Sequence, residues 1–225
     1  MITIISLLLL GSLLPNLSFT ASVKVRIVNG FEARPHSRPY MVSVQKNRRH
    51  VCGGFLISDQ FVLTAAHCRD NTEILTVVAG VHDLSSSSEN HVRIGVSTYN
   101  KPPEYNPDPK KPKISDLMIL KLNKKVKLNN KIKTIPIPMT PVQIRVDTDC
   151  SVAGWGFVTN SGPPSPTLRE ANVKIIKNTD CAGGSCDGDS GGPLVCDNTA
   201  VGITAFVSFK SCNDPNLPSP HGVNI

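Results

Sequence analysis

Long apolar runs are nearly absent from this 225-residue sequence. Outside residues 1–21 no stretch is long and apolar enough to span a membrane, so we expect a soluble mature protein without a membrane span. Residues 1–21 hold one apolar run that is itself too short to span, followed by small residues. This pattern is typical of a secretory signal peptide, although it lacks a basic start, and a membrane anchor is the weaker interpretation. The remaining chain is long enough to bury a core in one or two compact domains.

Acidic and aromatic residues are also scarce where the chain is most basic. Residues 110–133 contain nine lysines, with Asp116 as the only acid and no aromatic residue. Without interleaved aromatics, nucleic acid is not the expected partner. One interpretation is a solvated face, because lysines often protect the edges of sheets. The other is a binding site for a polyanion, from Lys110 to Lys133.

Helical periodicity is weak throughout, and short β-branched runs take its place. These runs are separated by Gly, Asn and Asp, as in proteins built from short strands. The pattern predicts an all-β fold with strands at residues 41–44, 55–57, 61–64, 74–78 and 173–176.

One stretch combines residues that favour neither helix nor strand. Residues 186–194 read Cys-Asp-Gly-Asp-Ser-Gly-Gly-Pro-Leu, which predicts a tight, exposed loop around Ser190. A serine hydroxyl attacks a carbonyl only when a base removes its proton and N–H groups receive the oxyanion. His67, in Leu-Thr-Ala-Ala-His-Cys, is a candidate base, and Asp116, in Ile-Ser-Asp-Leu-Met, is a candidate carboxylate.

The order His67, Asp116, Ser190 is that of the chymotrypsin template. Together the three motifs resemble the chymotrypsin-like serine proteases, and residues 34–41 resemble the granzyme and mast-cell protease branch. The resemblance covers most of the chain from Ile27 onward. It implies two antiparallel, six-stranded Greek-key barrels and a secreted or granule-stored endopeptidase that acts on protein substrates.

The resemblance also assigns roles to residues. Ser190 is expected to be the nucleophile, His67 the general base and Asp116 the group that orients His67. The N–H groups of Gly188 and Ser190 are expected to form the oxyanion hole. No metal or organic cofactor is implied, and no calcium site is expected in residues 80–89, where Val81 and the serines supply few charged oxygens.

Three further positions are expected to line the substrate pocket: Gly184, Val207 and Gly222. Gly184 stands where trypsin-like relatives carry an aspartate, so it offers no anchor for Lys or Arg. The isopropyl group of Val207 is expected to narrow the slot. Together they predict a preference for small or medium aliphatic residues.

Activation is expected to follow cleavage between Arg26 and Ile27 by another protease, as in the family. The new α-ammonium group of Ile27 would then pair with Asp189, which requires close geometry to offset desolvation. A basic spacer followed by an ordinary strand is the alternative. The resulting division is a signal peptide at residues 1–21, an activation propeptide at 22–26, an N-terminal barrel at 27–135 and a C-terminal barrel at 136–225.

Seven cysteines in a secreted chain imply disulfides with one cysteine left over. The resemblance implies the pairs Cys52–Cys68, Cys150–Cys196 and Cys186–Cys212. It leaves Cys181 as the odd cysteine, which is expected to be free or to pair with a cysteine of another molecule.

The second barrel is expected to be incomplete. Asp116 and Ser190 are 74 residues apart, against about 93 in the template. Relatives also continue past residue 225 through a strand and a helix. Lost edge pairing exposes backbone groups and apolar surface, so we expect poor folding or weak activity. The resemblance to granzymes implies sulfated proteoglycan as a partner of the basic stretch Lys110–Lys133. The alternative function is a catalytically weak or dead homologue that acts as a basic glycosaminoglycan-binding protein.

Overall fold

The computed structural model describes the chain in several ranges: 30–70, 72–107, 115–140, 142, 144–158, 163–175, 189–204 and 223–224. Within these ranges the protein consists of strands and one short 3₁₀ turn, η1, at Ala66–Cys68. The strands are β1 Phe31–Glu32, β2 Met41–Lys46, β3 Arg49–Leu56, β4 Phe61–Thr64, β5 Leu75–Ala79, β6 Val92–Asn100, β7 Met118–Leu122, β8 Asp149–Gly154, β9 Arg169–Lys174, β10 Pro193–Cys196, β11 Thr199–Ile203 and β12 Val223–Asn224.

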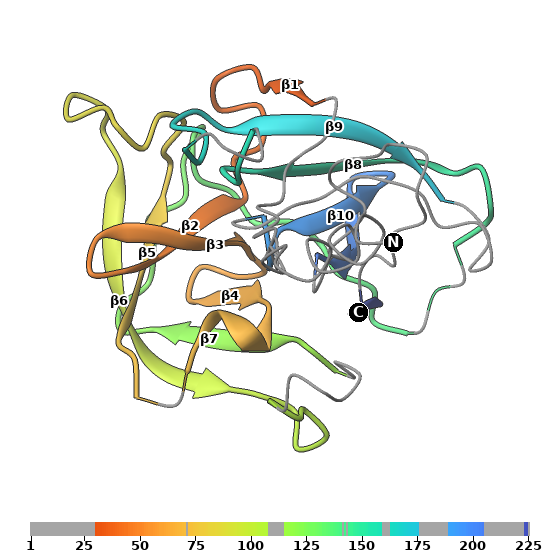
Figure 1. Cartoon of the computed structure of the whole chain (residues 1–225), viewed down its shortest axis with the longest axis horizontal. Coiled ribbons are helices and arrows are strands. Elements are labelled where there is room, and N and C mark those ends of the chain that lie inside the picture. The colour runs from red at the N-terminus through yellow and green to blue at the C-terminus, as the bar shows by residue number, and fades with distance from the viewer. Residues whose placement is uncertain are drawn as a thin grey trace, which may run out of the picture.

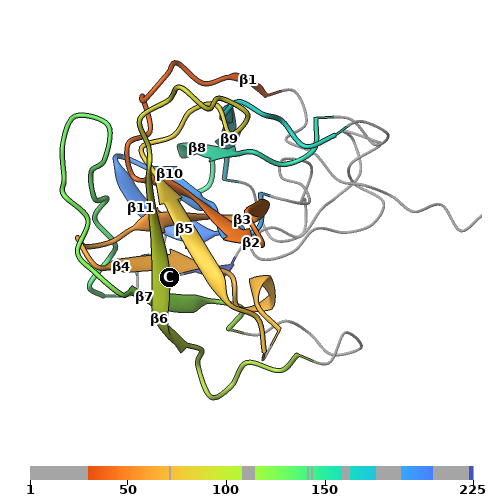
Figure 2. The ribbon, with the colours of Figure 1, turned by 90° about the vertical axis from the view of Figure 1, so that its left-hand side faces the viewer.

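Strands β2 to β7 close into an antiparallel barrel in the order β2-β3-β4-β7-β6-β5. The barrel occupies the left and lower part of Figure 1, and Figure 2 shows it from its own side. Alternate residues of these strands point inward, as the two-residue period of a strand requires. The largest fully buried side chains of the barrel are Phe55, Leu56, Leu75, Ile94, Met118, Leu120, Leu122, Val42 and Val44.

The other strands form a six-stranded antiparallel sheet in the order β1-β9-β8-β10-β11-β12. In the described residues this sheet does not close on itself, and both of its edge strands are two residues long. The predicted all-β fold, with a complete first barrel and an incomplete second one, is therefore confirmed. Strand β1 belongs to the second sheet although it precedes the first barrel, because it pairs with β9.

Three of the five predicted strands appear within one or two residues of their expected places, as β2, β4 and β5. The run predicted at 55–57 forms only the end of β3, which begins six residues earlier, at Arg49. The fifth prediction was displaced. Residues 173–176 were expected to form a strand, whereas β9 begins at Arg169 and its pairing ends at Lys174, opposite Asp149. The six residues of β9 pair one for one with the six of β8, and this pairing sets the strand's length.

A small apolar cluster joins the two halves of the molecule. Its members come from the barrel, the sheet and the loops between them: Ala33, Met41, Val78, Val81, Ala153, Trp155 and Leu168. Trp155 is fully buried, and its indole N–H donates to the carbonyl oxygen of His82 at 2.9 Å. This bond satisfies the polar end of a side chain that otherwise fills the junction.

Candidate active site

His67 and Asp116 meet at one end of the barrel. His67 lies in η1, just after β4, and Asp116 lies just before β7, whose pairing with β4 brings the two segments together. The carboxylate of Asp116 is completely buried and accepts two hydrogen bonds from His67. Oδ1 accepts the backbone N–H at 2.9 Å, and Oδ2 lies 2.7 Å from Nδ1. An ionised carboxylate can only accept a hydrogen bond, so this contact favours the tautomer in which Nδ1 donates and Nε2 is the nitrogen available for proton transfer.

The backbone beside Asp116 is constrained. Ser115 has a positive φ of 55°, and the N–H of Leu117 donates back to the carbonyl of Ser115 at 2.7 Å. A positive φ at a residue other than glycine is uncommon, and such residues tend to occur at functional sites. The ring of Tyr105 lies nearby. Burial raises the pKa of Tyr105, and the negative charges of Asp116 and Asp70 raise it further.

Backbone hydrogen bonds hold the turn at residues 189–192 from both sides. The N–H of Gly53 on β3 donates to the carbonyl of Ser190 at 2.8 Å. The N–H of Gly191 donates to the carbonyl of Thr204, just beyond β11, at 2.7 Å. Within the turn, the N–H of Gly192 donates to the carbonyl of Asp189 at 2.9 Å. The serine therefore sits on a turn that is attached to both the barrel and the second sheet.

Gly191 is required where it stands. Its φ is 82°, and a Cβ added there would lie 2.2 Å from Oγ1 of Thr64 and 2.5 Å from the carbonyl oxygen of Gly53. Glycine is the residue that combines this conformation with so close a backbone approach. The first glycine of the Ser-Gly-Gly motif is therefore required by the backbone conformation and by the close approach of β3 and Thr64.

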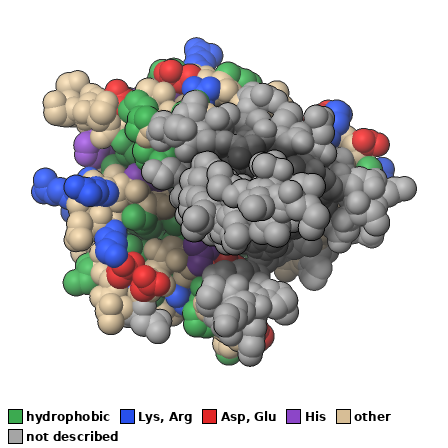
Figure 3. All heavy atoms as spheres, viewed as in Figure 1, with side chains coloured by type: hydrophobic (Ala, Val, Ile, Leu, Met, Phe, Trp, Pro, Cys, Tyr) green, Lys and Arg blue, Asp and Glu red, His purple; other side chains and the backbone are tan. Residues whose placement is uncertain are grey.

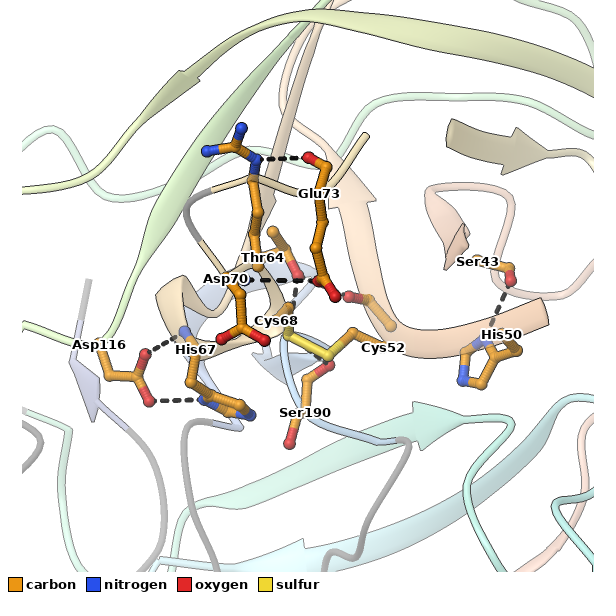
Figure 4. Close-up of a disulfide and its surroundings, with 12 residues drawn as sticks. Ser43, His50, Cys52, Thr64, His67, Cys68, Asp70, Glu73, Asp116 and Ser190 are labelled. Carbon is orange, nitrogen blue, oxygen red and sulfur yellow. Dashed lines mark hydrogen bonds and ion pairs between the residues drawn. A yellow bond between two sulfur atoms is a disulfide. The ribbon is translucent and has the colours of Figure 1, made fainter. Parts of the chain in front are cut away.

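Ser190 and His67 line one surface cavity of about 390 Å³. Figure 4 shows His67 between Asp116 and Ser190, with the Cys52–Cys68 disulfide beside the serine. The cavity is also lined by Val51, Phe157 and Pro164, which give it an apolar wall. The structure therefore brings together the three residues that were predicted to be catalytic.

Asp189 is 2% exposed and points into the second sheet. Its Oδ1 accepts the N–H of Gly156 at 2.9 Å. A Cβ added at Gly154 would lie 2.1 Å from the carboxylate of Asp189, and one added at Gly156 would lie 2.6 Å from it. The two glycines of the Gly-Trp-Gly motif therefore make room for this buried carboxylate.

Two of the three predicted disulfides are confirmed, Cys52–Cys68 and Cys150–Cys196. The first ties β3 to η1 and so to His67, and the second ties β8 to β10. The third predicted pair, Cys186–Cys212, lies outside the described residues, as does Cys181. The same is true of other predicted site residues: Arg26, Ile27, Gly184, Gly188, Val207 and Gly222.

Residues to which the sequence analysis gave no role complete the site. Thr64 Oγ1 donates to the carbonyl of Gly53 at 2.8 Å, and Gly53 in turn holds Ser190. Ser43 Oγ lies 2.8 Å from Nδ1 of His50, whose ring packs against Trp155 with its centroid 5.9 Å away. The signal available in the sequence was Gly53-Gly54 next to Cys52, which indicates close backbone approach without naming the partner.

The lysine-rich stretch is exposed wherever the structure describes it. Its described lysines are all solvent-exposed: Lys121, Lys124, Lys125, Lys127, Lys131 and Lys133. The ammonium group of Lys125 pairs with the carboxylate of Asp59 at 2.9 Å.

In the loop at residues 80–89, the Glu89 carboxylate accepts the N–H groups of His82 and Asp83 at 2.7 and 2.8 Å. No helix in the described ranges is long and apolar enough to cross a membrane.

A family model described as Trypsin matches residues 27–221, so the chain belongs to the trypsin family of serine proteases. Within that family it is similar to granzymes. It is 38% identical to Granzyme E of Mus musculus over 211 residues, which is 82% of this chain and 83% of that protein. It is 34% identical to Duodenase-1 of Bos taurus over 204 residues, 80% of this chain and 79% of that one.

Solved structures agree with this assignment. Neuropsin, a serine protease of mouse brain, superimposes with a TM-score of 0.78 and 32% identity over 88% of this chain and 94% of that one. Human heparin binding protein superimposes with a TM-score of 0.79 and 31% identity, over 88% of this chain and 92% of that one. The fold is therefore that of the chymotrypsin-like proteases, and the granzyme and mast-cell branch fits the sequence relatives.

Proposed function

We propose that this protein is a secreted or granule-stored serine endopeptidase that cleaves peptide bonds through Ser190, His67 and Asp116. The observation that carries the proposal is the Asp116–His67 pair at 2.7 Å, on the same cavity as Ser190. Membership of the trypsin family supports it.

In this mechanism Nε2 of His67 removes the proton of Ser190 as Oγ attacks the substrate carbonyl. The tetrahedral intermediate is stabilised by the N–H groups of Gly188 and Ser190, each worth about 3–4 kcal/mol. His67 then gives its proton to the leaving amine, and water hydrolyses the acyl-enzyme by the same steps. Buried Asp116 fixes the tautomer of His67 and stabilises the imidazolium while it exists.

Activation belongs to the same proposal. Cleavage after Arg26 would free the amine of Ile27, and Asp189 offers a buried carboxylate two residues before Gly191. Because the turn at 189–192 carries Ser190, an ion pair at Asp189 would fix the turn and the oxyanion donors together. An uncleaved Arg26→Gln variant should then remain inactive, while cleaved protein gains activity.

Specificity follows from Gly184, Val207 and Gly222, which favour small or medium aliphatic residues before the cleaved bond. The test is a set of matched peptides that carry Val, Ala, Arg or Phe at that position, given to the activated protein and to a Ser190→Ala control. We expect Val and Ala peptides to be cleaved fastest. Preferred cleavage after Arg would overturn the pocket assignment and leave the mechanism standing.

The second candidate function is binding of glycosaminoglycan by a catalytically weak homologue. Two observations favour it: the exposed lysines of residues 121–133 and the likeness to human heparin binding protein. A Lys124→Gln/Lys127→Gln variant should elute from heparin at lower salt than the parent. Lys174→Gln, which removes a lysine of β9 outside this stretch, is the control and should elute near the parent. Strong heparin retention without any titratable serine would favour this function over proteolysis.

A further inference from the structure

The β2–β3 hairpin carries a dense group of cations at its tip. β2 ends at Lys46 and β3 begins at Arg49, and these two residues pair across the strands. The two residues between them, Asn47 and Arg48, have φ of 50° and 63°, as in a two-residue type I′ turn. Lys46, Arg48 and Arg49 are all exposed to solvent around this turn. In Figure 3, Lys and Arg side chains gather over this hairpin at the left edge of the face.

A fourth cation lies against the hairpin and increases its positive potential. Arg93 on β6 donates to Thr76 Oγ1 at 3.0 Å. Thr76 on β5 pairs with Gln45, the residue before Lys46 on β2, so this bond holds Arg93 beside the hairpin. Burial lowers the pKa of Arg93, and the positive charge of Arg48 lowers it further. Lys46 is paired with Glu73, while in the described part of the chain neither Arg48 nor Arg49 forms an ion pair. Four cations therefore share one carboxylate.

These cations adjoin the catalytic cavity. The cavity that contains His67 and Ser190 extends to Lys46, His50 and Val51. A second cavity, of about 470 Å³, is lined by Lys46, Asn47, Arg49 and Val51. Lys46 and Val51 line both, so the two cavities adjoin: the first contains Ser190, and the second reaches Arg49 at the hairpin tip.

We propose that the cations of this hairpin and of the neighbouring β6, Lys46, Arg48, Arg49 and Arg93, which we call the basic extension, bind an acidic segment of the protein substrate on the leaving-group side of the cleaved bond. The inference rests on the proposed proteolytic function. His67, which protonates the leaving amine, and Cys68 line the cavity on its way to the hairpin. The peptide that follows the cleaved bond would thus run toward Arg49.

Chain geometry sets which substrate residues reach the cations. Cys52, bonded to Cys68 beside His67, is three residues from Arg49 along β3. Three residues of extended strand span about 10 Å. An extended substrate rises by the same amount per residue, so its third to fifth residues after the cleaved bond would face the basic extension. A polypeptide fits better than a polysaccharide here, because the first cavity contains the catalytic serine that would cleave it.

The first test compares cleavage of two peptides that differ only at the third to fifth residues after the bond, three Glu against three Gln. We expect kcat/KM to favour the Glu peptide by about tenfold at low salt, because several exposed ion pairs add their small contributions. The ratio should approach one near 0.5 M salt. It should also approach one in Arg48→Gly/Arg49→Gln, where glycine suits the positive φ at position 48.

Two controls sharpen the comparison. Asn47→Gly alters the same turn without removing charge and should keep the Glu preference. A peptide with the three Glu residues before the bond should gain nothing. A ratio near one in the parent protein, an unchanged ratio in the double variant, or a gain from Glu before the bond would each overturn the proposal.

The second test needs no catalysis and separates this proposal from the proposed function. Fluorescent Glu and Gln peptides that begin at the leaving-group residue are titrated into the Ser190→Ala protein, and anisotropy reports binding. Tighter binding of the Glu peptide that is lost in Arg48→Gly/Arg49→Gln supports the basic extension, even if the parent protein cleaves neither peptide. Equal binding of both peptides overturns it, and so does a hairpin-dependent affinity for heparin fragments but not for the Glu peptide.

Discussion

Two residues beside the catalytic side chains hold backbone conformations that most residues avoid. Ser115, next to Asp116, has φ of 55°, and Gly191, next to Ser190, has φ of 82°. At residue scale, the site is therefore built as much from backbone conformation as from side-chain chemistry. The conformation at Gly191 is linked to the barrel, because Thr64 and Gly53 leave no room for a Cβ.

Gly191→Ala should lower the free energy of unfolding by about 3 kcal/mol, since it combines a strained φ with contacts on backbone atoms. Urea unfolding followed by tryptophan fluorescence measures the change. The matched control is Gly95→Ala on β6, where the added Cβ would meet only the amide end of the Asn123 side chain at 2.7 Å. There we expect a loss below about 1 kcal/mol. Equal losses at the two positions would contradict this account of the turn.

His36 should make the protein less stable in acid. Its Nε2 lies 3.5 Å from Glu89, which favours protonation, but burial lowers its pKa from about 6.5, and Lys131 and His82 act in the same direction. The native state then binds fewer protons than the unfolded state as the pH falls through about 6.5. Unfolding takes up a proton in that range, so stability is present above it and falls on acidification.

The His36→Asn variant isolates this effect, because Asn tolerates the positive φ of 59° at this position. Urea unfolding at pH 7.5 and pH 5 should show a smaller loss of stability on acidification in the variant than in the parent. A larger loss in the variant would mean that the pKa of His36 is raised by Glu89.

At the scale of elements, the Cys52–Cys68 disulfide connects β3 to the turn that holds His67. Replacing both cysteines by Ala should lower the free energy of unfolding by about 3 kcal/mol, from the 16-residue separation. It should also lower kcat for peptide cleavage, because η1 loses an anchor. Calorimetry and peptide kinetics measure the two effects.

The Cys150–Cys196 pair is the control for this prediction. Its separation of 46 residues predicts a somewhat larger loss of stability, about 4 kcal/mol. It joins β8 to β10, away from His67, so the fall in kcat per folded molecule should be smaller. A larger fall in kcat from this pair would contradict the positioning role given to Cys52–Cys68.

Single elements also show what the sequence could and could not predict. The runs at residues 41–44 and 61–64 are short, mostly apolar and bounded by residues typical of turns and loops, so their strands were predictable. The β9 strand was displaced in the prediction because Arg169, Glu170 and Asn172 are polar, and only their pairing with β8 makes them strand. The Ser43–His50 pair and the Thr64–Gly53 bond depend on register between strands, which no local pattern encodes.

At the scale of the whole molecule, one barrel is closed and the second sheet is open in the described residues. The three motifs around His67, Asp116 and Ser190 were enough to predict this fold family, and the spacing between the last two predicted the incomplete half. The activation pair and the substrate pocket remain predictions, because Ile27, Gly184 and Val207 lie outside the described residues.

In the described part of the chain the second sheet is open, and the serine turn is attached to it through Thr204, so we expect weak activity. After cleavage at Arg26, active-site titration should count well under one reactive serine per molecule. A full count would show that the open sheet supports the turn as well as a closed barrel does.

The central claim is that Ser190 is made reactive by His67 and Asp116, and it is tested most directly by a fluorophosphonate label followed by peptide mapping. In protein cleaved after Arg26, we expect the label on Ser190 alone. It should be lost in His67→Ala, and its rate should fall by about 10⁴ in Asp116→Asn, which keeps the shape but reverses the tautomer. Labelling of another residue, or an unchanged rate in His67→Ala, would contradict the account.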